Sequence, residues 1–84
     1  MKIDVLLFAR VREQLGTPRV ETELAEGSSL QQLIEILVAE HGPLWREVLG
    51  VENVIRAVNQ VVSDGDVILS DGDEVAFFPP VTGG

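Results

Sequence analysis

Two segments near the start of the chain, residues 2–8 and 19–24, alternate hydrophobic and polar residues. A period of two predicts β-strands with one buried face. The side chains expected to point inward are Ile3, Val5 and Leu7 in the first segment and Val20, Thr22 and Leu24 in the second. Residues 9–15 are expected to form a turn or a short helix that ends at Gly16-Thr17-Pro18. The two strands are therefore expected to pair as a hairpin with a wide loop.

The clearest helical pattern follows these strands. Apolar residues recur at the i, i+3, i+4, i+7 and i+8 positions that form one helix face, namely Leu30, Leu33, Ile34, Leu37 and Val38. A serine at 28 or 29 can serve as the N-cap, and a glutamine at 31 or 32 can complete a capping box. Gly42-Pro43 predicts the end of the helix.

The second half of the chain predicts short elements. A short helix is expected over residues 43–50, and strands are expected at 54–58, 61–62, 67–69 and 74–78. One main amphipathic helix can cover only one face of a sheet, so the order predicts an α+β fold. We expect a ubiquitin-like β-grasp, a mixed sheet with one main helix packed on one face and the first and last strands in the centre. Residues 1–78 would form this domain, and residues 79–84 would form a flexible Gly-Gly tail.

Size and charge restrict the function. A chain of 84 residues fits one domain with a modest core, which favours a binding or carrier role over a self-contained enzyme. Its net charge of −8 argues against nucleic acid and against anionic membranes as partners, and favours a protein with a basic groove. No apolar run is long enough to span a membrane and the start lacks a signal-peptide pattern, so we expect a cytoplasmic protein.

Some kinds of site are excluded by composition. The chain has no cysteine and a single histidine, His41, which rules out disulfides, zinc–thiolate sites, thiol nucleophiles and multi-histidine metal sites. Asp-Gly-Asp sequences at 64–66 and 71–73 lack the ligand spacing of a calcium-binding loop and are typical of tight turns. We therefore expect neither a metal nor a cofactor bound by this chain.

The ending Pro79-Pro80-Val81-Thr82-Gly83-Gly84 is the most informative segment. Proline lacks an N–H donor, so the pair ends a β-ladder and favours an extended chain. Six extended residues span about 20 Å, enough to enter a partner's active site. Glycine has no Cβ, which leaves the carboxylate of Gly84 open to activation, for example as an acyl-adenylate, and to sulfur transfer. A terminal glycine pair alone can also be a frayed end or a cloning scar.

Two aromatic residues predict an interface. If the inward set of the first strand is buried, Phe8 points to the opposite face, and Phe78 does so in the last strand. Adjacent strands would place both rings on the sheet face away from the main helix, where Val62 can join them. An exposed aromatic patch on a small domain usually marks a protein interface. The alternative is that the short helix of residues 43–50 covers these rings.

These residues resemble a known family, the small subunits of molybdopterin synthase, which are sulfur carriers with a ubiquitin-like fold. The resemblance runs along the whole chain and is most specific in the ending from Asp71 to Gly84, above all in Phe-Phe-Pro-Pro-Val-Thr-Gly-Gly. Other matching segments are Leu7-Phe8-Ala9, Val11-Arg12-Glu13, Gly16 and Val58-Asn59-Gln60.

The resemblance implies a reaction cycle. A ubiquitin-activating-type adenylyltransferase would use ATP to adenylate Gly84, and a sulfur donor would convert the acyl group to a thiocarboxylate. The tail would enter the large catalytic subunit, in a heterotetramer, and supply the dithiolene sulfurs of molybdopterin from a cyclic pyranopterin phosphate. Gly83, which has no side chain, would precede the reacting residue. The interface would include Phe8, Val62 and Phe78 as anchors and Pro79, Pro80, Val81 and Thr82 in the inserted tail.

Other functions share parts of this pattern. A ubiquitin-like modifier would have the same fold and tail and would form isopeptide adducts on lysines. A carrier for another sulfur pathway, such as thiazole synthesis, would associate with a different synthase. A plain interaction domain would keep its function without the last two residues.

Overall fold

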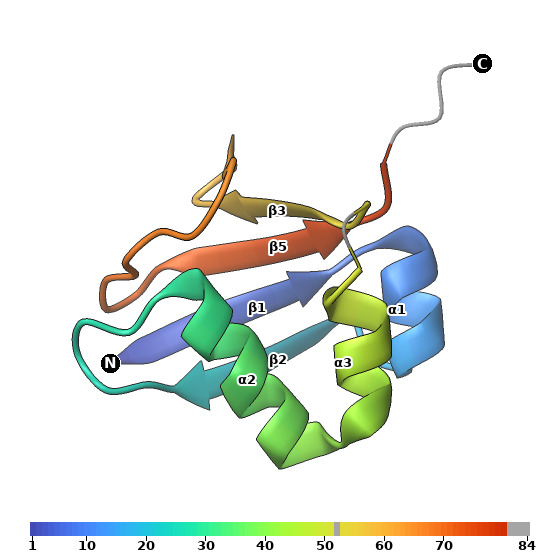
Figure 1. Ribbon diagram of the computed structural model, residues 1–84, viewed down its shortest axis with the longest axis horizontal. Coiled ribbons are helices and arrows are strands. Elements are labelled where there is room, and N and C mark those ends of the chain that lie inside the picture. Colours follow the sequence, from blue (N-terminus) through green and yellow to red (C-terminus); the bar gives the residue numbers. More distant parts are fainter. Residues whose placement is uncertain (52, 81–84) are drawn as a thin grey trace.

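The computed structural model describes residues 1–51 and 53–80. In order, the elements are β1 (Lys2–Leu7), α1 (Ala9–Leu15), β2 (Arg19–Glu23), α2 (Leu30–His41), α3 (Pro43–Leu49), β3 (Ile55–Val58), β4 (Val61–Val62) and β5 (Glu74–Phe78). Figure 1 shows the helices gathered on one side of a twisted sheet, with α2 lying across it. The α+β, β-grasp prediction is confirmed. None of the helices in this described part is long and apolar enough to cross a membrane.

The sheet has the strand order β2-β1-β5-β3-β4. β1 runs parallel to β5, with Val5 opposite Val75 and Leu7 opposite Phe77, and the other neighbouring strands are antiparallel. The first and last strands therefore lie side by side in the interior of the sheet, as expected. Because the two strands are parallel, their C-terminal ends lie at the same edge of the sheet. The chain therefore leaves the sheet beside the end of β1 (Figure 1).

The core lies between the sheet and the helices. Alternate residues of β1 and β5 are fully or almost fully buried, and they meet the apolar faces of α2 and α3. This layer consists of Ile3, Val5, Leu7, Val75 and Phe77 from the strands and Leu30, Leu33, Ile34, Leu37, Trp45, Val48 and Leu49 from the helices. The period-two and helical patterns thus correctly identify the buried faces. Trp45 is buried and stacks on His41 at 4.2 Å between ring centroids.

The start of α2 is fixed by two sets of hydrogen bonds. Ser29 is the N-cap, and its hydroxyl accepts from the N–H of Gln32 at 3.2 Å while the Gln32 side chain accepts from the N–H of Ser29 at 2.8 Å. The Asp66 carboxylate accepts from the N–H of Gln31 at 2.9 Å. This backbone hydrogen bond lowers the pKa of Asp66 below its ordinary value.

The prediction of a strand at residues 67–69 is wrong. This segment forms only an isolated bridge between Ile68 and Ser29. The carbonyl of Val67 accepts from the N–H of Leu30 at 2.8 Å, and the N–H of Leu69 donates to the carbonyl of Ser28 at 2.9 Å. The backbone is thus paired with the loop before α2 instead of with the sheet. Leu69 is buried while Ile68 is 68% exposed, so only part of this run of three apolar residues enters the core.

The second Asp-Gly-Asp sequence forms a turn that holds β1. The Asp71 carboxylate accepts from the N–H of Lys2 at 2.7 Å, and the N–H of Gly72 donates to the carbonyl of Lys2 at 2.8 Å. Asp73 accepts from the N–H of Ser70 and from the side chain of Asn59. These carboxylates are occupied by backbone and amide donors, in keeping with the turn interpretation. The residues described by the structure contain no group of three or more acidic, histidine or cysteine side chains that could hold a metal ion.

Removing the cap of α2 should destabilise the domain. We expect Ser29→Ala to lower the free energy of unfolding by about 1 kcal/mol, because the N–H of Gln32 loses its acceptor. For a domain of this size that corresponds to a fall in Tm of about 4–8 °C. Ser70→Ala, at an exposed position, is the matched control and should leave Tm almost unchanged. Equal Tm values for the two variants would show that the cap contributes nothing.

Acid should selectively remove the contribution of Asp66. Its folded-state pKa is lowered, so ionised Asp66 stabilises the fold above the unfolded pKa, and this contribution is lost as the pH falls through the folded pKa. We expect Asp66→Asn to lower the urea midpoint at pH 7 and to match the unsubstituted chain at pH values below the folded pKa. Asp64→Asn, in the same turn, is the control. A difference that persists unchanged at low pH would contradict the charge explanation.

Candidate functional site

The end of β5 anchors the C-terminal segment. Phe77 is fully buried under the helices, and its carbonyl accepts from the N–H of Phe8 at 3.1 Å. Phe78 follows at the last position of β5, and Pro79 and Pro80 are half-buried. Residues 81–84, which include the predicted reacting residue Gly84, its neighbour Gly83 and the tail residues Val81 and Thr82, lie outside the described residues.

The face of the sheet away from the helices carries an apolar surface beside this exit. One row runs straight across four strands, since Leu6 lies opposite Ala76, Ala76 opposite Ala57 and Ala57 opposite Val62. The next row toward the tail contains Ile55 opposite Phe78, with Phe8 next to it on the β1 side. We call these residues the outer-face patch: Leu6, Phe8, Ile55, Ala57, Val62, Ala76 and Phe78.

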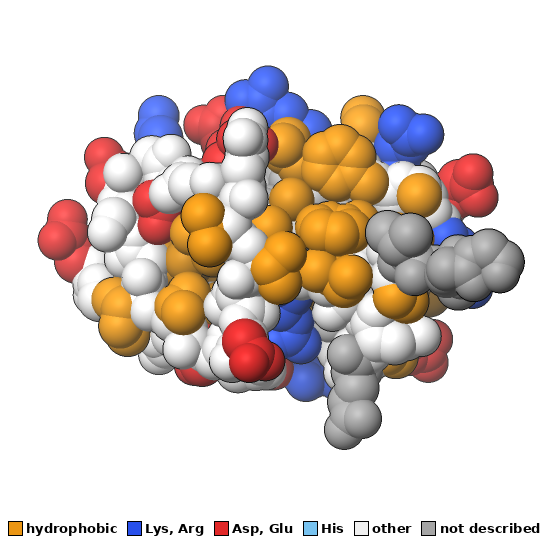
Figure 2. All heavy atoms as spheres, turned by 90° about the horizontal axis from the view of Figure 1, so that it is seen from above, with side chains coloured by type: hydrophobic (Ala, Val, Ile, Leu, Met, Phe, Trp, Pro, Cys, Tyr) orange, Lys and Arg blue, Asp and Glu red, His pale blue; other side chains and the backbone are white. Residues whose placement is uncertain are grey.

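The structure brings together the three residues predicted as interface anchors. Phe8 is 45% exposed, Val62 is 61% exposed and Phe78 is half-buried, and all three lie on the outer face. The alternative in which the short helix covers the rings is wrong, because α3 packs on α2 and α1 at the opposite face (Figure 1). Figure 2, which views the molecule from the β3 side, shows hydrophobic side chains gathered beside the end of the described chain.

Four members of the outer-face patch were not predicted from the sequence. Leu6 occupies an outward position of β1 where the alternation calls for a polar residue, and this exception is a signal that could have identified it. Ile55, Ala57 and Ala76 become neighbours of the aromatic rings only through the β3–β5 register. Single-sequence patterns do not specify that register.

Charge changes sharply along the outer face. The row beyond the outer-face patch, away from the tail, contains Asp4 opposite both Glu21 and Glu74. Arg19 donates to the Asp4 carboxylate at 2.6 Å, and this hydrogen bond raises the pKa of the Arg19 guanidinium above its ordinary value. An apolar half beside the tail and an acidic half farther away suit a partner with an apolar pocket and a basic rim.

The junction between β1 and α1 sets the direction of two side chains. Ala9 has a φ of 51°, a left-handed conformation that costs a non-glycine residue roughly 1–2 kcal/mol. It turns the chain sharply between Phe8, on the outer face, and Arg10, in the first turn of α1. One strained residue thus separates the outer-face patch from the helix side.

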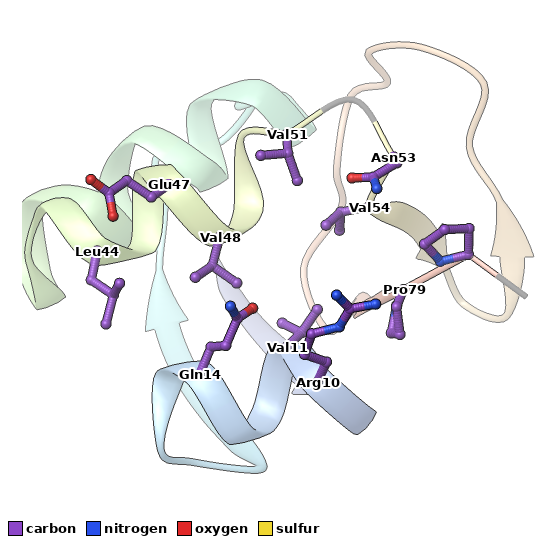
Figure 3. Close-up of a pocket in the computed structure, with 11 residues that line it drawn as sticks. Arg10, Val11, Gln14, Leu44, Glu47, Val48, Val51, Asn53, Val54 and Pro79 are labelled. Carbon is purple, nitrogen blue, oxygen red and sulfur yellow. The ribbon is translucent and has the colours of Figure 1, made fainter. Parts of the chain in front are cut away.

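A groove of about 250 Å³ lies on the helix side of the exit. Its walls come from α1, α3, the segment before β3 and the two prolines after β5 (Figure 3). Val11, Val48 and Val54 supply apolar lining, and Arg10, Gln14 and Glu47 supply polar groups at its rim. An apolar floor with a mixed polar rim is the composition of a contact surface.

Comparison with known proteins gives full-length matches. Residues 5–84 match the ThiS family. The chain is 44% identical over 82 residues to the molybdopterin synthase sulfur carrier subunit of Escherichia coli, covering 98% of this chain and 99% of that protein. It is 40% identical over 85 residues to the corresponding subunit of Mycobacterium tuberculosis, covering 100% of this chain and 99% of that protein.

Solved structures give the same picture. A complex of subunits 1 and 2 of the molybdopterin-converting factor from Helicobacter pylori contains a chain with a TM-score of 0.70 and 28% identity, with 100% of both chains covered. SAMP1 from Haloferax volcanii has a TM-score of 0.86 at 24% identity, again over 100% of both chains, and this likeness shows the shared fold alone. The chain therefore belongs to the ThiS family, among its molybdopterin synthase sulfur carrier subunits.

Proposed function

We propose that this chain carries sulfur as a thiocarboxylate on Gly84 and delivers it to the large subunit of molybdopterin synthase. The observation that carries this proposal is the match over 98% of the chain to a molybdopterin synthase sulfur carrier subunit. The sulfur would be used to build the molybdopterin dithiolene on a cyclic pyranopterin phosphate. The chain itself would bind no cofactor, and ATP would be consumed by the activating enzyme.

The loading chemistry takes place on the last residue. The Gly84 carboxylate attacks the α-phosphorus of ATP on a ubiquitin-activating-type adenylyltransferase, and pyrophosphate leaves. A persulfide on the sulfur donor then attacks the acyl carbon through its terminal sulfur, and AMP leaves. A thiol then forms a disulfide with the donor sulfur, and the thiocarboxylate is released. A carboxylate is a poor electrophile and a thiocarboxylate is a good nucleophile, so both steps serve the later transfer. The described domain contributes no catalytic group to these steps.

What the domain contributes is placement of the tail. Phe77 holds β5 in the core, while Phe78 and Phe8 lie on the outer face beside the exit. A partner that covers the outer-face patch is thereby positioned next to the tail. Docking would then hold the acyl group close to the partner's active site. The Helicobacter pylori structure similar to this chain is a complex of subunits 1 and 2, which supports a large-subunit partner. Assembly as a heterotetramer is part of the proposal.

Mass spectrometry tests the loading step. Incubation of the chain with the activating enzyme, ATP and a sulfur donor should exchange one oxygen for sulfur on the C-terminal peptide. Deletion of Gly84 should abolish the exchange and the synthase activity. It should move Tm by less than about 4 °C, since the last residue of a chain usually contributes little to stability. An established carrier should first show that the activating enzyme is active. If this chain then shows no exchange of oxygen for sulfur, the proposal is refuted.

The outer-face patch can be tested by charge substitution. We expect Phe78→Asp to raise the Kd for the large subunit by about 30-fold or more, the effect of losing a hot spot worth ~2 kcal/mol. Phe8→Asp, at a more exposed position, should act in the same direction. Titration calorimetry on each variant would measure the Kd, and Tm would verify folding.

The matched control is Ile68→Asp, which introduces the same charge at an exposed apolar side chain near the start of α2. Its Kd should stay within about 3-fold of the unsubstituted value, as expected for a residue outside the outer-face patch. Unchanged affinity in both folded phenylalanine variants would remove the outer-face patch from the interface.

A further inference from the structure

An activated acyl group is a hazard to its own carrier. Amines and thiols attack acyl-adenylates and thioesters, so a lysine within reach of activated Gly84 would be acylated. The chain has no cysteine, and of its six Lys and Arg residues only Lys2 is a lysine. Arginine keeps the positive charge, but its guanidinium does not lose its proton in proteins and is not a nucleophile.

Arg10 is a cation that lies beside the base of the tail. It lines the helix-side groove together with Pro79 and Pro80, and Figure 3 shows its guanidinium reaching toward Pro79. Four residues follow Pro80 in the sequence, and at ~3.3 Å per residue they span at most about 13 Å. The side chain at position 10 therefore lies within the distance that the acyl group of Gly84 can cover.

The two amines of the chain lie at the other end of the sheet. Lys2 begins β1, whereas the tail leaves beside Phe8, about 20 Å away along a strand that rises ~3.3 Å per residue. The amino group of Met1 donates to the carbonyl of Leu24 at 2.8 Å, next to Lys2. Both amines thus lie farther from Pro80 than the four residues that follow it can span, since those residues cover at most about 13 Å.

We propose that Arg10 maintains a positive charge beside the tail without offering an acceptor, so that activated Gly84 reacts with groups of its partners and not with its own carrier. With a lysine at this position, the amine nitrogen would bond to the acyl carbon of Gly84, the bond to AMP would break, and the amine would lose a proton to solvent. The product would be a cyclic amide that can no longer accept sulfur. The inference rests on the proposed activation of Gly84.

The test begins from a chemically prepared thioester at Gly84, which needs no activating enzyme. The full chain, Arg10→Lys and Arg46→Lys would be kept at about 10 μM, where a short tether supplies an effective concentration on the order of mM. Arg46 is the matched control because it lies in α3 but pairs with Glu35 of α2 at 2.6 Å, away from the groove. Intact mass distinguishes the cyclic amide, which is lighter by one water molecule, from the hydrolysed acid.

We expect Arg10→Lys to form the amide about 100-fold faster than the other two chains, the ratio of the tethered to the bulk concentration. Peptide mapping should place the new bond at position 10, and Tm should confirm folding of every variant. A folded Arg10→Lys chain that only hydrolyses would overturn the inference, as would cyclisation of the unsubstituted chain through Lys2 or Met1. Either failure would leave the proposed sulfur-carrier function standing, because that function is tested by loading with the enzyme.

Discussion

The parallel pairing of β1 with β5 is the constraint on which the rest of the structure depends. It joins the first and last strands of the domain, and it buries Val5 against Val75 and Leu7 against Phe77 beneath the helices. A parallel pair requires a long connection, and here that connection contains the helices and the remaining strands. The pairing also determines where the chain leaves the sheet, because β5 ends beside the last residues of β1.

Alternation converts this pairing into a recognition surface. Every residue that β1 and β5 bury under the helices has neighbours that point outward, and near the tail those neighbours are apolar. Farther along the same strands they become Asp4 and Glu74. A partner that matches this change of polarity can dock in one orientation only, which directs the tail toward one place on the partner. Under the proposed function, recognition of the partner and delivery of the tail would thus follow from the same two strands.

Much of this arrangement could be predicted from the sequence, for physical reasons that differ between elements. The helical spacing of Leu30 to Val38 and the alternation in β1 depend directly on burial. The predicted buried faces of α2 and β1 were therefore correct. The strand predicted at 67–69 was wrong because this apolar run forms only a bridge to Ser29, a tertiary contact that no local pattern encodes. The placement of Phe8 and Phe78 followed once the first and last strands were taken as neighbours. Ile55 and the groove beside Arg10 depend on register and helix packing, which a single sequence does not specify.

An exposed apolar patch on a small domain is also a liability, since it favours self-association. The net charge of −8 opposes that tendency by repulsion between copies, and it attracts a partner with a basic rim. The few cations have local roles: Arg19 pairs with Asp4, Arg46 pairs with Glu35, and Arg56 donates to the carbonyl of Leu49. Arg10, in contrast, lines the groove beside Pro79 and Pro80. Under the proposed function, the same distribution of charges opposes self-association and favours one kind of partner, while Arg10 adds no amine beside the tail.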